Sequence, residues 1–192
     1  MSTKKIAFFA SGSGSNIENI VTYMGLKQYN IQYLIFCNKP DAFVLERAKK
    51  LNIDSIVFDK SDLRENQSVL NHLKRFQPDL IVLAGFLWLM PPNIVQEFPN
   101  RIINIHPALL PDYGGKGMYG MRVHESVVLN KEKYSGITIH YVNEHYDEGK
   151  YILQETCLLT ENDTAEDVAS KVHALEYEHF PKVIEKLLLA NS

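Results

Sequence analysis

Asn104 and His106 lie two residues apart in the segment IINIHP, and their types and spacing suggest acid–base and oxyanion chemistry. Residues i and i+2 on a β-strand project to the same face, so the amide and the imidazole are expected side by side. Pro107 ends the predicted strand and leaves both groups at the carboxyl edge of a parallel sheet, where ligands of open α/β folds bind. The alternative is a structural histidine whose hydrogen bonds are satisfied inside the core.

The chemistry that suits this pair is group transfer without a covalent enzyme intermediate. An amide can donate to a developing oxyanion, and a protonated imidazole can donate as well and then pass its proton to a leaving nitrogen. The chain has no G-x-S-x-G nucleophile elbow. We therefore favour direct attack of a substrate amine on a carbonyl. A carboxylate beside His106 would hold its tautomer and raise its pKa, and Asp147 is the candidate because its loop is expected to return to the same sheet edge.

A glycine-rich turn, Ser11-Gly12-Ser13-Gly14-Ser15-Asn16, follows the first predicted strand and precedes a helix. Its glycines allow the backbone to expose N–H groups, and a helix N-terminus adds partial positive charge, so the turn suits a phosphate. A dinucleotide fingerprint is excluded, because the third glycine and the later acidic residue are both missing. The Walker A pattern fails as well, because no lysine follows. A purely structural turn is the alternative interpretation.

The elements that must position these groups alternate between apolar runs and helical patterns. Buried strands are predicted over 5–10, 31–36, 55–58, 80–84 and 102–105, and helices over 17–23, 42–51, 63–76 and 123–130, with a short one after Pro91-Pro92. This alternation predicts an α/β fold with a doubly wound, mostly parallel sheet.

The second half of the chain changes character. Residues 107–121 form a long glycine-rich loop, and strand-like stretches over 136–142 and 151–158 are expected to extend the sheet antiparallel. Thr164 opens a long C-terminal helix with a capping box to Asp167, and Pro181 should kink that helix.

Composition excludes several classes of function. The net charge of −3 and the pI near 6.2 argue against nucleic acid or an anionic membrane as the main partner. Cys37 and Cys157 stand outside any C-x-x-C spacing and fit a reducing compartment. The apolar run 6–10 is too short for a signal peptide, and no stretch approaches the ~20 apolar residues of a membrane span. We expect a cytoplasmic protein acting on small molecules, as a monomer or a homodimer.

A possible metal motif, His173-x-x-Glu176-x-x-His179, occurs on the last helix, but it is not H-E-x-x-H, and we expect no metal.

Four segments, SGSGSN, AGFLWLM, NIHPALLP and HYVNEHYDEGKYILQ, together resemble the phosphoribosylglycinamide (glycinamide ribonucleotide) branch of the folate-dependent formyltransferases. The likeness runs from about Lys5 to Pro181. It implies a Rossmann-like formyltransferase fold in one domain over 1–192, with a phosphate-binding half over about 1–100 and a catalytic and folate-binding half over about 101–192. It also implies formyl transfer from 10-formyltetrahydrofolate to the glycyl amine of 5-phosphoribosylglycinamide, through a tetrahedral intermediate, in purine synthesis.

The resemblance assigns roles by position. Asn104, His106 and Asp147 correspond to the catalytic trio, Gly14, Ser15 and Asn16 to the phosphate site, and Glu176 to the ribose site. The folate pocket corresponds to Leu87, Trp88, Leu89 and Met90, to Asn143, Glu144, His145 and Tyr146, and to Arg64, with Asn104 also contacting the folate. The chain departs from the family in its longer loop GGKGMYGMRVHES and in Trp88, which stands where arginine is frequent.

Two related activities are alternatives. A formyltetrahydrofolate hydrolase uses the same trio, but it usually carries an N-terminal regulatory domain. Formyltransferases acting on tRNA or sugar nucleotides are usually longer, and those acting on tRNA favour a more basic surface.

Overall fold

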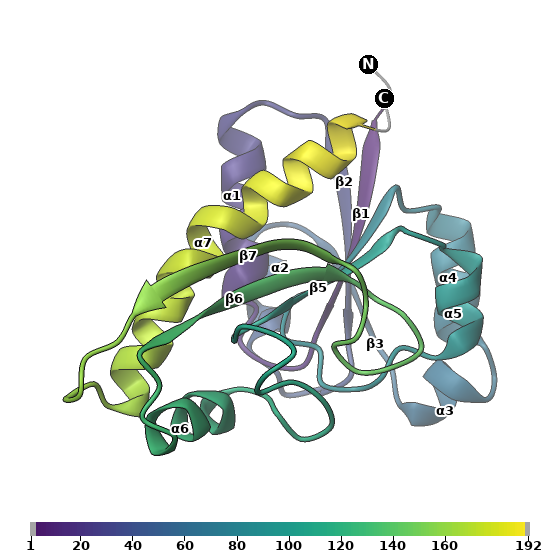
Figure 1. Ribbon diagram of the computed structural model, residues 1–192. Helices are drawn as coiled ribbons and strands as arrows, with labels where there is room; N and C mark the ends of the chain where they lie inside the picture. The colour runs from purple at the N-terminus through teal and green to yellow at the C-terminus, as the bar shows by residue number, and fades with distance from the viewer. Residues whose placement is uncertain (1–2, 191–192) are drawn as a thin grey trace.

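The structure, a computed structural model, describes residues 3–190 and shows one twisted sheet between two layers of helices (Figure 1). Within these residues the sheet has seven strands in the order β3-β2-β1-β4-β5-β6-β7. The strands are β1 (Lys4–Ala10), β2 (Ile31–Cys37), β3 (Asp54–Val57), β4 (Leu80–Leu83), β5 (Ile102–His106), β6 (Tyr134–Tyr141) and β7 (Tyr151–Leu158). The predicted fold class is confirmed.

The first five strands are parallel to one another, whereas β6 pairs antiparallel with β5, and β7 antiparallel with β6. The end of β6 is therefore beside the beginning of β5, where Tyr141 pairs with Ile103. The loop over 142–150 starts at that end. The sequence suggested that this loop returns directly to the sheet edge beside His106. It has to fold back along β5 instead to bring Asp147 to His106.

The helices divide between the two faces of the sheet. Helices α1, α2, α6 and α7 contribute to one apolar cluster, and α3, α4 and α5 to the other. Their bounds are α1 (Ser15–Leu26), α2 (Val44–Lys50), α3 (Lys60–Arg64), α4 (Ser68–Phe76), α5 (Pro92–Glu97), α6 (Met121–Leu129) and α7 (Ala165–Ala190).

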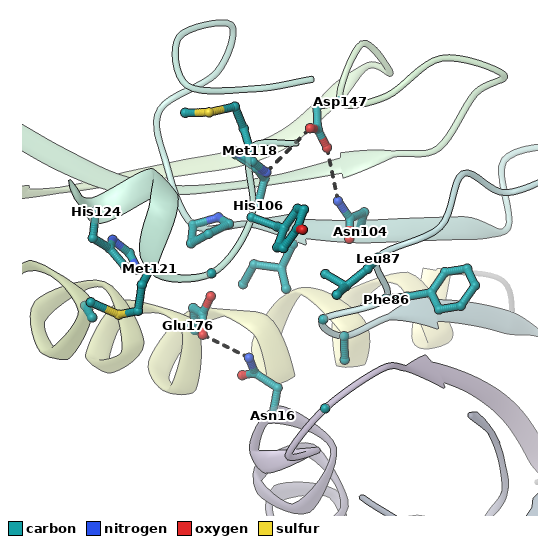
Figure 2. Close-up of a pocket in the computed structure, with 18 of the residues that line it drawn as sticks. Asn16, Phe86, Leu87, Asn104, His106, Met118, Met121, His124, Asp147 and Glu176 are labelled. Atoms are coloured by element: carbon teal, nitrogen blue, oxygen red, sulfur yellow. Dashed lines mark hydrogen bonds and ion pairs between the residues drawn. The ribbon is translucent and has the colours of Figure 1, made fainter. Parts of the chain in front are cut away.

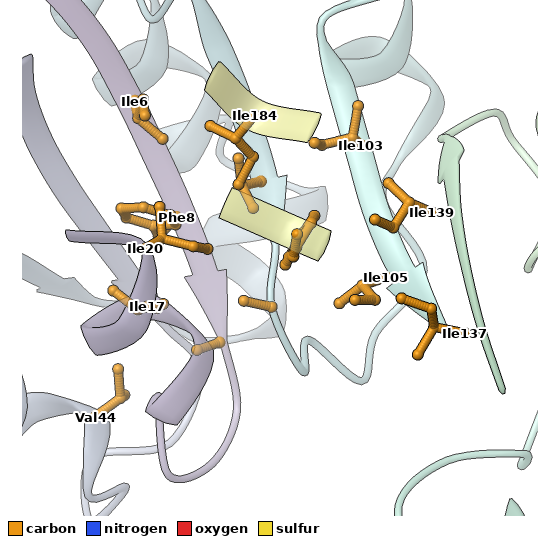
Figure 3. Packing of buried hydrophobic residues seen from close by; sticks show 14 of the residues in the cluster. Ile6, Phe8, Ile17, Ile20, Val44, Ile103, Ile105, Ile137, Ile139 and Ile184 are labelled. Carbon is orange, nitrogen blue, oxygen red and sulfur yellow. The ribbon is translucent and has the colours of Figure 1, made fainter. Parts of the chain in front are cut away.

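Strand β1 shows why its sequence is apolar without alternation. Ile6 and Phe8 pack in the first cluster, with Ile17 and Ile20 of α1 and Ile184 of α7 (Figure 3). The neighbouring Ala7 and Phe9 point to the opposite face and join the second cluster. A strand covered on both faces has no solvent side, which is the usual situation in parallel sheets.

One predicted helix, over 63–76, is wrong in its extent. Helix α3 begins earlier because Asp59 and Asp62 form a capping box, in which each side chain accepts from the other's backbone N–H. The chain then turns before α4, where Gln67 has a left-handed backbone with φ 59°. The Asn66 side chain accepts from the backbone N–H of Ser68 at 2.9 Å, and this local bond competes with continued helix.

The capping box predicted for the last helix is confirmed. The backbone N–H of Thr164 donates to Asp167 Oδ2 at 2.9 Å, and the Asp167 N–H donates back to Thr164 Oγ1 at 3.2 Å. Helix α7 continues through Pro181 to Ala190.

Candidate active site

A cavity of about 630 Å³ opens at the carboxyl ends of β1, β4 and β5. Its size is within the range of small-molecule sites, which is roughly 300–1,000 Å³. The turn over 12–16 forms one end and Asn104, His106 and Asp147 form the other, with α7 and the loop over 115–120 as walls (Figure 2). Of the residues that the sequence proposed, it is lined by Gly14, Ser15, Asn16, Leu87, Asn104, His106, Tyr146, Asp147 and Glu176.

The turn after β1 is held by close packing. Gly14 has φ 73°, and a Cβ at this position would overlap the side chain of Val44 in α2. Both the backbone conformation and the lack of space therefore require glycine. Arg47 of α2 donates from Nε to the carbonyl of Ser13 at 2.9 Å and also pairs with Glu18. Arg47 belongs to a run of mostly charged residues over 46–50, and such side chains on an amphipathic helix usually face solvent. Its guanidinium braces the turn instead.

The backbone at the start of α1 is available to a ligand. Gly14 is the N-cap and has no side chain to cap the helix, and the Ser15 N–H donates to Ser13 Oγ at a long distance of 3.4 Å. The first N–H groups of a helix have no partner within the helix, and together with the helix dipole they favour an anion. The start of α1 is therefore suited to an anion, and the binding of a phosphate there stays a prediction.

Asn16 and Glu176 meet at the floor of the cavity. The Asn16 amide donates from Nδ2 to Glu176 Oε2 at 2.9 Å, and its buried Oδ1 has no hydrogen-bond partner. His173 Nδ1 donates to the same Glu176 oxygen at 2.8 Å, which raises the pKa of His173. Glu176 is only 5% exposed. A buried carboxylate that faces a cavity and keeps a second oxygen uncommitted is suited to accept hydrogen bonds from hydroxyl groups.

The trio predicted from the sequence is assembled. Asp147 Oδ1 is 3.5 Å from Asn104 Nδ2, and Asp147 Oδ2 is 3.6 Å from His106 Nδ1 (Figure 2). His106 is buried, at 4% exposed, and Asp147 is nearly so. The carboxylate therefore contacts both of the groups that could act on a carbonyl.

Burial governs the charge state of this pair. Desolvation lowers the pKa of His106 below its ordinary value of 6.5, although Asp147 and the carbonyl of Tyr113 act to raise it. Desolvation also acts to raise the pKa of Asp147, but the neighbouring His140 and His106 outweigh it, so that pKa lies below its ordinary value. The Asp147 carboxylate therefore acts on the His106 pKa in the expected direction, but loss of solvation is the larger effect.

His140 of β6 is a further side chain in contact with the trio. Its Nδ1 donates to the carbonyl of Tyr141 at 2.9 Å, which leaves Nε2 to accept from the Asn104 amide at 3.2 Å. Nε2 is also 3.6 Å from Asp147 Oδ1. His140 therefore fixes which way the Asn104 amide faces.

The residues predicted for the folate pocket are dispersed. Leu87 and Tyr146 line the cavity, whereas Trp88, Leu89, Met90, Asn143, Glu144, His145 and Arg64 do not. Two contacts connect this outer set: Arg64 donates to the carbonyl of Leu89 at 3.3 Å, and Gln96 of α5 donates to Glu144 at 2.9 Å. Trp88 packs edge-on against Phe58 and Phe86, with Lys60 Nζ 5.7 Å from its ring centroid. Met90 is buried in the core.

His124 and Lys116 are two further residues that line the cavity. His124 of α6 is 3% exposed and its Nδ1 has no hydrogen-bond partner. Burial lowers its pKa. Nothing in the helical pattern around His124 distinguished it from a core histidine.

The three residues of the motif on α7 do not converge on one point. His173 and Glu176 face the cavity, whereas His179 lies near Glu155 and Glu178 instead. Across residues 3–190, no three histidine, cysteine or acidic side chains cluster as metal ligands would. None of the helices in this same range has the length and apolar character needed to cross a bilayer.

Comparison with known proteins places the chain in a family. The model of the formyl transferase family matches residues 4–184. A chloroplastic phosphoribosylglycinamide formyltransferase of Arabidopsis thaliana is 40% identical over 189 residues, which are 94% of this chain and 64% of the relative. The phosphoribosylglycinamide formyltransferase of Bacillus subtilis is 37% identical over 98% of this chain and 97% of its own length. The chain thus spans less than two thirds of the plant relative and nearly all of the bacterial one.

Solved structures agree with this placement. The crystal structure of phosphoribosylglycinamide formyltransferase from Bacillus halodurans has a TM-score of 0.86 and 36% sequence identity, over 96% of this chain and 95% of that one. The family inferred from the four sequence segments is therefore confirmed, and the chain belongs to the formyl transferase family.

Proposed function

We propose that this protein is a phosphoribosylglycinamide formyltransferase, which moves the formyl group of 10-formyltetrahydrofolate onto the glycyl amine of 5-phosphoribosylglycinamide during purine synthesis. The observation that carries the proposal is that one cavity joins a phosphate-type turn to the Asn104–His106–Asp147 trio. The names of the relatives support the same reaction.

The ribonucleotide fits the end of the cavity near α1. Its phosphate would be bound by the backbone N–H groups of Ser15 and Asn16, the first of which is engaged only at a long distance by Ser13 Oγ, and by the dipole of α1. Glu176, which Asn16 and His173 hold in place, would accept hydrogen bonds from the ribose hydroxyls. The glycyl amine would then extend toward His106.

The folate would enter between the loops after β4 and β6. Leu87 gives the cavity an apolar wall there and Tyr146 an aromatic one, and sites for planar heterocycles are mostly apolar with a few fixed polar groups. We also assign Trp88, Leu89, Met90, Arg64, Asn143, Glu144 and His145 to this region, and the contacts of Arg64 with Leu89 and of Gln96 with Glu144 support that assignment.

When bound, the folate supplies a formyl carbon attached to its N10 nitrogen. Attack by the glycyl amine forms a new carbon–nitrogen bond, and the carbonyl electrons move onto oxygen. The hydrogen bond from the Asn104 amide to Asp147 is long, at 3.5 Å, and therefore weak. The same N–H can therefore donate to the formyl oxygen, together with His106. The amine gives up one proton to the His106–Asp147 pair, and His106 returns a proton to N10 as the bond from N10 to the formyl carbon breaks.

The experiment that tests this function is a direct assay with both substrates, with water alone as the competing acceptor. We expect formylation of the ribonucleotide and little hydrolysis in its absence. Release of formate at the same rate with and without the ribonucleotide would instead identify a formyltetrahydrofolate hydrolase.

We further propose that residues 1–192 act as a single domain in the cytoplasm, as a monomer or homodimer that binds small molecules and no nucleic acid or membrane. The two apolar clusters share one sheet, and the first of them draws on both halves of the chain, which supports one cooperative unit. The slightly negative net charge supports the choice of partners.

A further inference from the structure

The side chain of Tyr113 is part of a hydrogen-bond chain that ends on the catalytic imidazole. His106 Nε2 donates to the backbone carbonyl of Tyr113 at 2.8 Å. The phenol of Tyr113 donates to Glu132 Oε1 at 2.7 Å and accepts from Asn130 Nδ2 at 2.8 Å. A surface anchor just after α6 is therefore connected to His106 through a single residue.

The backbone of Tyr113 is strained. Its φ of 56° is in the left-handed region, which bulky residues rarely adopt. Such a conformation costs of order 1–3 kcal/mol and persists only where the surroundings hold it. Glycine would adopt it without strain, and Gly114 and Gly115 follow immediately. A tyrosine at this position is consistent with a need for its side chain, whose ring packs on the core and whose hydroxyl is held at both sides.

The next residues of the same loop hold the partner of the imidazole. The backbone N–H of Gly115 donates to Asp147 Oδ2 at 2.9 Å, the same oxygen that faces His106 Nδ1. The segment 113–115 thus contacts both members of the pair, with a carbonyl on the histidine and an amide on the aspartate.

We propose that residues 113–115 form a backbone clamp on the His106–Asp147 pair, and that Tyr113 is the positioning residue that sets the clamp through its phenol. The inference rests on the proposed function for its effect on catalysis. The clamp keeps a proton on Nε2, because a carbonyl oxygen can only accept. The His106 nitrogen that exchanges protons with the substrates is then Nδ1, which faces Asp147.

The test uses Tyr113→Phe in the full chain, which keeps the ring and removes the hydroxyl. Tyr134→Phe is the matched control, because Tyr134 is an exposed tyrosine on β6, away from the cavity. A second variant, Glu132→Ala, removes the anchor from the opposite side. Kinetic constants are measured together with ¹⁵N NMR shifts of the His106 ring, which report its tautomer without substrate.

We expect Tyr113→Phe to lower kcat roughly tenfold, since misplacing a catalytic group by about 1 Å can cost roughly 10²-fold. The KM of either substrate should stay within about twofold, and the ring should change from the Nε2–H form to a tautomer mixture. Glu132→Ala should act similarly, the double variant should add little, and Tyr134→Phe should match wild type.

Unchanged kcat and unchanged ¹⁵N shifts in Tyr113→Phe would overturn the clamp, as would a rise in KM alone or an equal loss in Tyr134→Phe. The proposed function fails in a different way. If wild type did not formylate the ribonucleotide, but Tyr113→Phe still changed the His106 tautomer, the clamp would stand and only the reaction would be wrong.

Discussion

The side-chain amide of Asn16 donates to the carboxylate of Glu176, a residue 160 positions further along the chain. The bond joins the turn after β1 to the middle of α7 and forms the floor of the cavity (Figure 2). It also commits one N–H of the Asn16 side chain to Glu176, so the proposed phosphate site would depend mainly on the backbone N–H groups of the turn.

Glu176→Gln should weaken binding of the ribonucleotide. A hydrogen bond to a charged group contributes about 1.5–3 kcal/mol, so we expect KM for the ribonucleotide to rise roughly 10- to 100-fold. The KM for the folate should change little. Glu166→Gln, an exposed change on the same helix, is the control. Steady-state kinetics with each substrate varied in turn would reveal the difference, and equal losses for both substrates would place Glu176 outside the ribose site.

Gly12→Val tests the phosphate site more cleanly than any change at Gly14. A Cβ at Gly14 would overlap Val44, whereas a Cβ at Gly12 meets no atom within 4 Å. The valine side chain should therefore reduce space for the phosphate without unfolding the turn, and it should raise the ribonucleotide KM but not the folate KM. Gly25→Ala, in an equally open position on α1, is the control for a general effect of substitution. Isothermal titration with each ligand separately would also detect the difference.

The trio should act as a unit. We expect His106→Ala and Asp147→Asn each to lower kcat by about 10²–10⁴-fold, the usual contribution of acid–base groups, with little change in KM. The double variant should be much less impaired than the product of the single effects, because the two side chains contact each other. If Asp147→Asn kept kcat within about threefold of wild type, far from that range, Asp147 would not have the assigned role.

The pH dependence should follow the sign of each contribution to the His106 pKa. Burial places that pKa below 6.5, while the Asp147 carboxylate acts to raise it. If protonated His106 is required, kcat/KM should fall as pH rises through this lowered pKa. In Asp147→Asn the raising contribution is lost, so the midpoint should move to still lower pH. NMR titration of the His106 ring in both proteins measures this directly, and a midpoint that moves upward would contradict the assignment.

Trp88 should report on folate binding through its neighbour. Its ring contacts Phe86, which lines the cavity, at a centroid distance of 6.3 Å. A non-reactive folate analogue should therefore change the tryptophan emission saturably, after correction for absorbance, and the ribonucleotide alone should change it much less. Emission that ignores a fully inhibitory analogue would mean that Trp88 only packs on the aromatic cluster with Phe58, and the folate assignment of Trp88 would be lost.

Sequence was informative wherever a residue type has one principal use. Asn104 and His106 were recognisable because two polar side chains in an apolar strand need a reason to be there. The glycines of the first turn were recognisable because few other residues tolerate that backbone. The strands of the parallel sheet could be predicted because continuous apolar runs leave no face for solvent, as in a strand buried on both faces.

The sequence did not reveal contacts that are made by backbone atoms or that join distant segments of the chain. The carbonyl of Tyr113 and the amide of Gly115 contact His106 and Asp147, yet every residue has a carbonyl and nearly every residue an amide. Arg47 was missed because a charged side chain on an amphipathic helix normally faces solvent. The net pKa of His106 depends on how deeply the folded chain buries it, and that depth is a property of the tertiary structure.

The bond between Asn16 and Glu176 also bears on when the site comes into existence during synthesis. The strands and the trio precede residue 165, but Glu176 lies within the last helix, so a nascent chain lacks the cavity floor until α7 has left the ribosome and docked. Ribonucleotide should then bind the chain with α7 docked in preference to any form with α7 detached, and mass action makes it a ligand that favours docking. Hydrogen exchange along α7 should slow when the ribonucleotide is present.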